Sequence, residues 1–182
     1  MNNEATSRQE NRGMLTGLFR DRDSADSAYR SLRDRGYTDD EINVMMSDET
    51  RDKYYKDPDS AIGESDNKAL EGLGAGSAIG GTLGAIIGGI AAIGTNVLLP
   101  GLGLVVWGPI AAGLAGAGAG GLTGGLVGAL IGWGIPEEHA KQYEEGIRSG
   151  GTVLGVRPRT DDDASYFENE WRTNYRGESI YR

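Results

Sequence analysis

The pattern of apolar and polar positions over residues 14–46 predicts a strand, a helix and a second strand. Residues 14–19 form a short apolar run, and apolar positions alternate with smaller or polar ones over residues 42–46, as in a half-buried strand. Between these strands, apolar side chains recur at the 3.6-residue spacing of one helix face. These side chains are Ala25, Ala28, Tyr29 and Leu32.

The ends of this helix are also marked in the sequence. Asp23 or Ser24 can accept a hydrogen bond from the free N–H groups of the first turn, and Gly36 suits the left-handed conformation that ends many helices. A matching pattern lies at residues 136–157, where Pro136 suits a first helical turn and residues 152–156 predict a third strand. The β-α-β and α-β fragments complete each other, which predicts one small α/β sandwich split between residues 14–46 and 136–157.

A run of 65 residues without one charged side chain separates the two fragments, although 25% of the chain is charged. Within this run glycine recurs at every fourth position, in two ladders. Four-residue spacing keeps positions near one helix face, so each ladder predicts a groove where another backbone can approach closely. The ladders are Gly72, Gly76, Gly80, Gly84 and Gly88, then Gly116, Gly120, Gly124, Gly128 and Gly132.

Residues 72–135 therefore predict a glycine-zipper helical hairpin inserted in the α/β domain. Its helices, Gly72–Gly94 and Ile110–Gly134, have 23 and 25 residues, and at about 1.5 Å rise per residue each could cross a hydrocarbon layer of about 30 Å. Residues 95–101 provide the turn. Opposite each ladder lies a bulky face, expected to point toward lipid or neighbouring subunits. The bulky residues are Ile86, Ile90, Leu122, Leu126 and Leu130.

Two environments can offset the poor helix propensity of so much glycine. The nine glycines of the first helix cost on the order of 9 kcal/mol relative to alanine. Insertion in a membrane would enforce helical structure, and a tight helix pair in a soluble homo-oligomer would supply close contacts instead. A flexible segment is the third alternative.

A membrane is the expected partner, with both termini cytoplasmic because no signal peptide is present, and a cytoplasmic homo-oligomer is the alternative. A small pore is disfavoured because no polar residue would line it.

The flanking segments are polar. Residues 1–13 predict a disordered arm, residues 47–71 a polar linker with a short helix, and residues 158–182 an acidic and aromatic tail. In the tail, aromatic residues recur four apart, as on one face of a helix. Such a helix could dock on the sheet or hairpin, or form an interface with a membrane or partner. These residues are Phe167, Trp171 and Tyr175.

Composition argues against most kinds of chemistry. A net charge of −9 disfavours nucleic acid as a partner, and the absence of cysteine excludes disulfides and thiolate sites. The glycines at 72–76 do not follow a strand, as a phosphate-binding loop requires. His139 is the single histidine, and residues 161–163 are more simply a solvated acidic run than a cation site. We therefore expect no cofactor, no metal, no small-molecule ligand and no enzymatic activity.

Several segments together resemble the bacterial general stress proteins, a family that includes heat-induced proteins and low-temperature-induced proteins of cyanobacteria. The similar segments are 18–28, Gly36-Tyr37, 42–46, the glycine-rich insertion, 134–140, Tyr143-Glu144 and 150–156. The resemblance implies an association with stress and a ferredoxin-like α+β sandwich carrying the inserted hairpin, and it supplies no catalytic residues. After Val156 the chain departs from members that continue with another helix and strand. The sheet could then be completed within the chain or by a partner.

Overall fold

The fold is built on one antiparallel sheet. The computed structural model describes residues 13–55, 96–99, 103–111, 125–132 and 134–182. Within them, six strands lie in the order β3-β4-β2-β5-β1-β6, and all neighbours are antiparallel. The strands are β1 (Leu15–Phe19), β2 (Ile42–Ser47), β3 (Asn96–Leu99), β4 (Leu104–Trp107), β5 (Thr152–Val156) and β6 (Glu178–Tyr181). The predicted α+β class is therefore confirmed.

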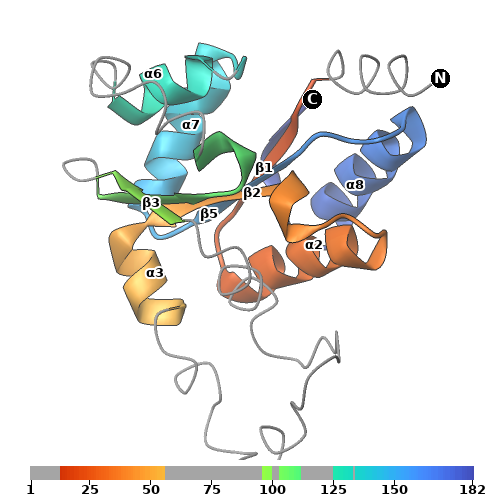
Figure 1. Ribbon diagram of the computed structural model, residues 1–182, viewed down its shortest axis with the longest axis horizontal. Helices are drawn as coiled ribbons and strands as arrows, with labels where there is room; N and C mark the ends of the chain where they lie inside the picture. The colour runs from red at the N-terminus through yellow and green to blue at the C-terminus, as the bar shows by residue number, and fades with distance from the viewer. Residues whose placement is uncertain (1–12, 56–95, 100–102, 112–124, 133) are drawn as a thin grey trace, which may run out of the picture.

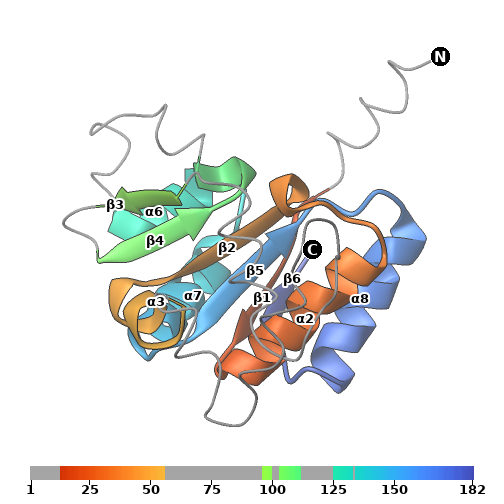
Figure 2. The same ribbon diagram turned by 60° about the horizontal axis from the view of Figure 1, so that its bottom comes forward.

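Helices cover both faces of the sheet (Figures 1 and 2). They are α2 (Arg22–Asp34), α3 (Asp48–Tyr54), α6 (Gly125–Gly132), α7 (Glu137–Arg148) and α8 (Asp161–Thr173), with a 3₁₀ turn, η1, at Asp39–Glu41. Helices α2 and α8 share one hydrophobic core with the sheet, and α6 and α7 share the other. Alternate residues of β1 belong to the two cores: Leu15 and Phe19 face α2 and α8, whereas Leu18 faces α7.

Two strand–helix–strand units interlock in the sheet. In the first, α2 connects β1 to β2, and β5 lies between these two strands. In the second, α8 connects β5 to β6, and β1 lies between them. Everything from α3 to α7 is inserted between β2 and β5, and it adds β4 and β3 beyond β2.

The first β-α-β unit follows the sequence pattern. All four residues predicted for the inner face of α2 are buried, and Gly36, at φ +84°, ends the helix as expected. The predicted cap is wrong by two or three residues: Asp21 caps α2, because its carboxylate accepts a hydrogen bond of 2.9 Å from the backbone N–H of Ser24.

The tail prediction is also wrong in one respect. Residues 158–182 hold a 13-residue helix and a strand, α8 and β6, so the chain does continue with another helix and strand after Val156. Strand β6 pairs with β1 and completes this side of the sheet within the chain. Thr160 caps α8 by accepting from the N–H of Asp163 at 3.0 Å. The acidic run is thus the first turn of a helix, where negative charge is favourable.

The centre of the uncharged run differs from the predicted hairpin. The segment expected to turn between two helices contains β3, which pairs with β4, and β4 pairs with β2. Four consecutive buried residues, 104–107, form β4. Their β-branched and aromatic side chains suit a strand, but a run without polar positions shows no period by which strand and helix could be distinguished.

Other predictions fall on residues that the structure does not describe. These include residues 1–12 of the arm, most of the linker, the first helix at 72–94, and all ladder glycines except Gly128 and Gly132. The short helix predicted within residues 47–71 is confirmed as α3.

Candidate functional site

The glycine-rich segment leaves the sheet at a rigid point after β4. Gly108 has φ +90°, and a Cβ built there would lie 2.2 Å from the carbonyl oxygen of Ile42 on the neighbouring strand. Only glycine permits this close approach. Buried Asn43 fixes the next residues, because its Oδ1 accepts from the N–H of Ile110 at 2.8 Å while its Nδ2 donates to the carbonyl of Gly155 at 3.2 Å. A helix begins at residue 109, so this amide side chain holds its first turn against the sheet.

The segment returns to the domain through α6. Leu126 and Leu130 are 4% and 1% exposed and belong to the same core as Met45 and Val106 of the sheet. The sequence prediction that these leucines face lipid or other subunits is therefore wrong, because the second face of the sheet needs an apolar cover and α6 supplies it. We call these two anchoring points, Asn43–Gly108–Ile110 and Leu126–Leu130, the insertion base.

A glycine corner fixes the path from α6 to α7. The N–H of Gly134 donates to the carbonyl of Ile131 at 2.9 Å, and the N–H of Ile135 donates to that of Leu130 at 3.1 Å. Gly134 has φ +84° and Ile135 is buried, so this corner has the bonding and the hydrophobic contact of a Schellman-type helix end.

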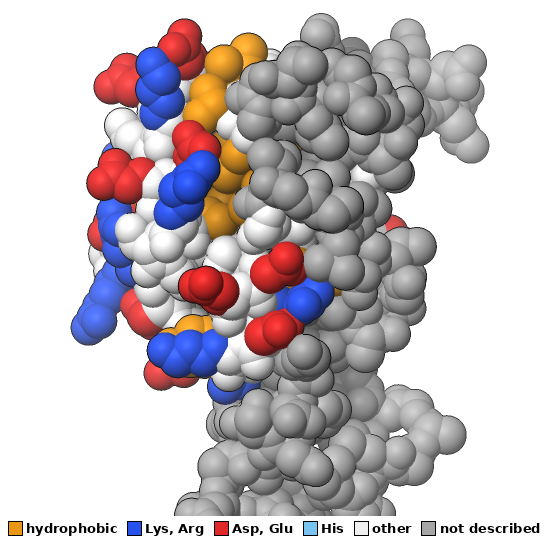
Figure 3. All heavy atoms as spheres, turned by 90° about the vertical axis from the view of Figure 1, so that its left-hand side faces the viewer, with side chains coloured by type: hydrophobic (Ala, Val, Ile, Leu, Met, Phe, Trp, Pro, Cys, Tyr) orange, Lys and Arg blue, Asp and Glu red, His pale blue; other side chains and the backbone are white. Residues whose placement is uncertain are grey.

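Gly128, which belongs to the second glycine ladder, points away from this core. Gly128 is half-buried, and no described atom lies within 4 Å of a Cβ built on it. Ile131, on the next turn, is 43% exposed. Figure 3 shows a band of hydrophobic side chains on this side of the molecule, with charged side chains of both signs to its left and below it. The glycine side of α6 at Gly128 is thus turned outward, while its bulky face, with Leu126 and Leu130, packs in the core.

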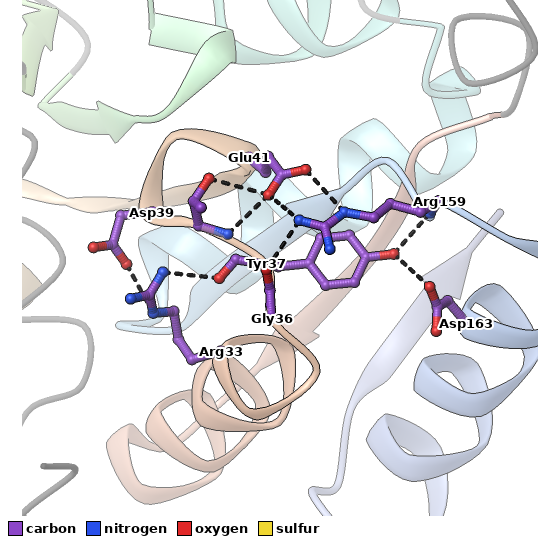
Figure 4. Close-up of polar contacts among 8 residues, drawn as sticks. Arg33, Gly36, Tyr37, Asp39, Glu41, Arg159 and Asp163 are labelled. Atoms are coloured by element: carbon purple, nitrogen blue, oxygen red, sulfur yellow. Dashed lines mark hydrogen bonds and ion pairs between the residues drawn. The ribbon is translucent and has the colours of Figure 1, made fainter. Parts of the chain in front are cut away.

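A second candidate site surrounds Tyr37, which follows α2 (Figure 4). Its hydroxyl donates to Asp163 Oδ2 at 2.9 Å and accepts from the backbone N–H of Arg159 at 2.7 Å. The ring lies under the Arg159 guanidinium, 4.3 Å from Cζ to the ring centroid. Burial is the main cause that raises the pKa of Tyr37, to about 12. The hydroxyl is therefore neutral and acts as a fixed donor.

Arg159 connects the two interlocked units. Its guanidinium donates to both carboxylate oxygens of Glu41, at 2.6 and 3.1 Å, and to the carbonyl of Gly36 at 2.9 Å. Burial alone would raise the pKa of Glu41, but hydrogen bonds from Arg159 and Thr38 outweigh it and hold that pKa below its ordinary value. We call the residues Tyr37, Glu41, Arg159 and Asp163 the Tyr37 junction.

The Tyr37 junction is suited to holding elements together. Asp163 also accepts from Arg35 at 2.8 Å, and hydrogen bonds from Arg35 and Tyr37 outweigh burial and lower its pKa. Each of the four side chains is engaged by groups of this chain, so the arrangement presents neither an activated nucleophile nor a poised base. The sequence reasoning missed this site; the only signal was Gly36-Tyr37 within the family resemblance.

We expect the Tyr37 junction to lose its stabilising effect in acid. The pKa values of Glu41 and Asp163 are lowered on folding, so their contribution is present above about pH 4 and is lost as pH falls through the folded-state values. Replacing Glu41 by glutamine should cost about 1 kcal/mol at pH 7 and flatten the dependence below pH 4. Urea unfolding at several pH values measures both effects. Glu168→Gln, which breaks an exposed pair with Arg172, is the control, and equal behaviour of the two variants would contradict the expectation.

The other residues considered for chemistry lie apart. No group of three or more His, Asp or Glu side chains that could hold a metal ion occurs among the described residues. His139 packs against Tyr181, with ring centroids 4.9 Å apart. Of the acidic run, Asp163 belongs to the Tyr37 junction and Asp161 pairs with Arg182 at 3.0 Å.

The aromatic residues of the tail are part of the core. Phe167 and Trp171 are fully buried under α8, and Tyr175 packs against the same core. Phe167 meets Tyr37 edge to face at 5.4 Å, and Trp171 meets Phe19 at 5.5 Å. Docking of the tail helix on the sheet is confirmed, and the side chains of Phe167 and Trp171 are not available to a membrane or partner in this fold.

Comparisons with protein-family models, curated proteins and solved structures found no match to this chain. None of the helices in the described ranges combines the length and the apolar character needed to cross a bilayer.

Proposed function

We propose that this protein is a non-enzymatic stress-response protein, in which a ferredoxin-like unit holds a glycine-rich insertion for self-association. The observation that carries the proposal is the insertion base. The chain enters and leaves the segment at residues 112–124 from two points anchored in the core, and Gly128, on the second of these anchors, points outward. A segment held in this way can present backbone at short range to another copy of itself.

The ferredoxin-like assignment is supported by topology. Strands β2-β5-β1-β6, connected as β1-α2-β2 and β5-α8-β6 with both helices on one face, have the β-α-β-β-α-β connectivity of that fold. In this proposal the helix of the second unit is α8, whereas the sequence pattern placed that helix between Pro136 and the strand at residues 152–156. In this proposal α7 and the β3–β4 pair belong to the insertion.

The family resemblance gives the association with stress. Several of its segments have structural roles that an α+β framework needs: Gly36 ends α2, Tyr37 forms the junction, and residues 150–156 contain β5. None of these roles is catalytic, which supports a function in assembly.

Bulky replacements on the glycine ladder test the proposal. Gly120→Leu combined with Gly124→Leu should reduce the assembled fraction at least tenfold, because leucine prevents close approach of backbones. Gly118→Leu, which lies two positions from the ladder and so on the opposite face, is the matched control. Light scattering of the full chain measures the mass. Normal assembly of the double variant would show that the ladder is not a contact face.

Membrane insertion is the second candidate, favoured by the 23 uncharged residues from Gly72 to Gly94. Alkaline carbonate washing of the same proteins separates the two functions. Retention of the wild type in the membrane pellet favours insertion, whereas release as a detergent-independent oligomer favours self-association in water.

A further inference from the structure

The two edges of the sheet differ in their suitability for pairing with another strand. At the β6 edge, the register shifts between Thr16 and Leu18 of β1, and Arg176 and Ser179 have φ values of +53° and +49°. Tyr143 donates to the carbonyl of Ser179 at 2.7 Å, and Glu178 pairs with Arg20 at 2.8 Å. Irregular backbone, charge and an occupied acceptor are features by which proteins prevent pairing at an edge.

Among the described residues, the β3 edge shows none of these protections. β3 pairs with β4 in regular register over four successive positions, and no described strand lies beyond it. Its sequence, Asn-Val-Leu-Leu, contains no charge and no proline, and it lies within the 65-residue uncharged run. A regular, apolar edge is a template for another strand.

We propose that β3 pairs antiparallel with β3 of a second copy, which joins two six-stranded sheets into one continuous sheet. Antiparallel pairing of a strand with its own copy is symmetric about a twofold axis, so one edge supplies both halves of the interface. The charge distribution favours a second copy as the occupant. Two chains of net charge −9 repel over most of their surfaces, but β3, β4 and α6 carry no charged residue.

The uncharged elements lie together at this end of the molecule. In Figure 1, β3 lies at the opposite end of the sheet from β1, and α6 covers the sheet on the same side. Helix α6, which carries Gly128 and the exposed Ile131, therefore lies on the same side of the molecule as the proposed seam. The pairing uses backbone groups of β3 and does not rest on the glycine ladders of the proposed function.

The experiment uses the full chain with single lysines in β3. Successive strand residues point to opposite faces, so Val97→Lys and Leu98→Lys together test both faces of the proposed seam. The wild type should have twice the mass of one chain by light scattering, and at least one lysine variant should raise the dimer dissociation constant at least tenfold without changing the circular dichroism spectrum. Ser165→Lys, at an exposed position of α8, makes the same charge change and should remain dimeric.

Amide hydrogen exchange gives a readout that needs no variant. Protection of β3 amides in the wild type should fall on dilution, whereas protection of β5 should not. A monomeric wild type, dimers that resist both lysines, or β3 exchange that is independent of concentration would each overturn the pairing. If the Gly120→Leu/Gly124→Leu variant dissociates while the β3 lysine variants remain dimeric, the interface is the glycine ladder and pairing at the β3 edge is rejected. If only the β3 lysine variants dissociate, the interface is the β3 edge and the glycine ladder is rejected as a contact face.

Discussion

Replacing Trp171 by alanine should lower the free energy of unfolding by about 3–5 kcal/mol, as expected for a fully buried indole. The ring lies over Gly17 of β1, where a built Cβ would be 3.0 Å from the ring, and it meets Phe19 edge to face. It therefore connects α8 to a strand near the start of the chain. Loss of the ring leaves a cavity between the helix and the sheet that the rigid strand cannot fill.

Urea unfolding followed by circular dichroism measures this change, and Tyr166→Ala is the matched control. Tyr166 is an aromatic residue on the same helix, but it is 37% exposed, so its removal should cost about 1 kcal/mol or less. Equal costs for the two variants would mean that α8 is not part of the cooperative core. The tail would then be an appendage to the sheet.

The elements that could be predicted from the sequence are those with a clear local pattern. Helices α2 and α7 alternate between core and surface at the helical period. Strands β1, β2 and β5 are short buried runs bounded by polar residues or glycine. In the uncharged run polar residues are too few to show a period, so β3 and β4 could not be distinguished from helix. Strand β6 has a different problem, because its two apolar residues, Ile180 and Tyr181, are adjacent and so point to opposite faces of the sheet.

The candidate sites depend on contacts between distant parts of the chain. In the Tyr37 junction, the hydrogen bonds join residues 118 to 126 positions apart, and no local pattern contains that information. Asn43 was predicted only as a polar position in a strand. Its role follows from the placement of β4 beside β2, which brings Ile110 to its side chain.

Gly108→Ala should be among the most damaging single-methyl changes in the described chain. The new Cβ would meet the carbonyl oxygen of Ile42 at 2.2 Å and the Asn43 Cα at 3.0 Å, and φ +90° is itself unfavourable for alanine. Backbone atoms of a central strand cannot move away as a flexible side chain can. We expect a loss on the order of 3 kcal/mol or more, and loss of the Asn43–Ile110 hydrogen bond as β4 separates from β2.

Gly103→Ala separates the two causes of this loss. Gly103 also has a positive φ, +62°, but no described atom lies within 4 Å of its built Cβ. It should therefore cost only about 1–2 kcal/mol, the conformational part alone. Urea unfolding gives the two free energies, and amide exchange at Ile110 reports the hydrogen bond to Asn43. If Gly108→Ala costs no more than Gly103→Ala, contact with β2 does not fix the start of the glycine-rich segment, and the anchoring on which the proposed function depends is lost.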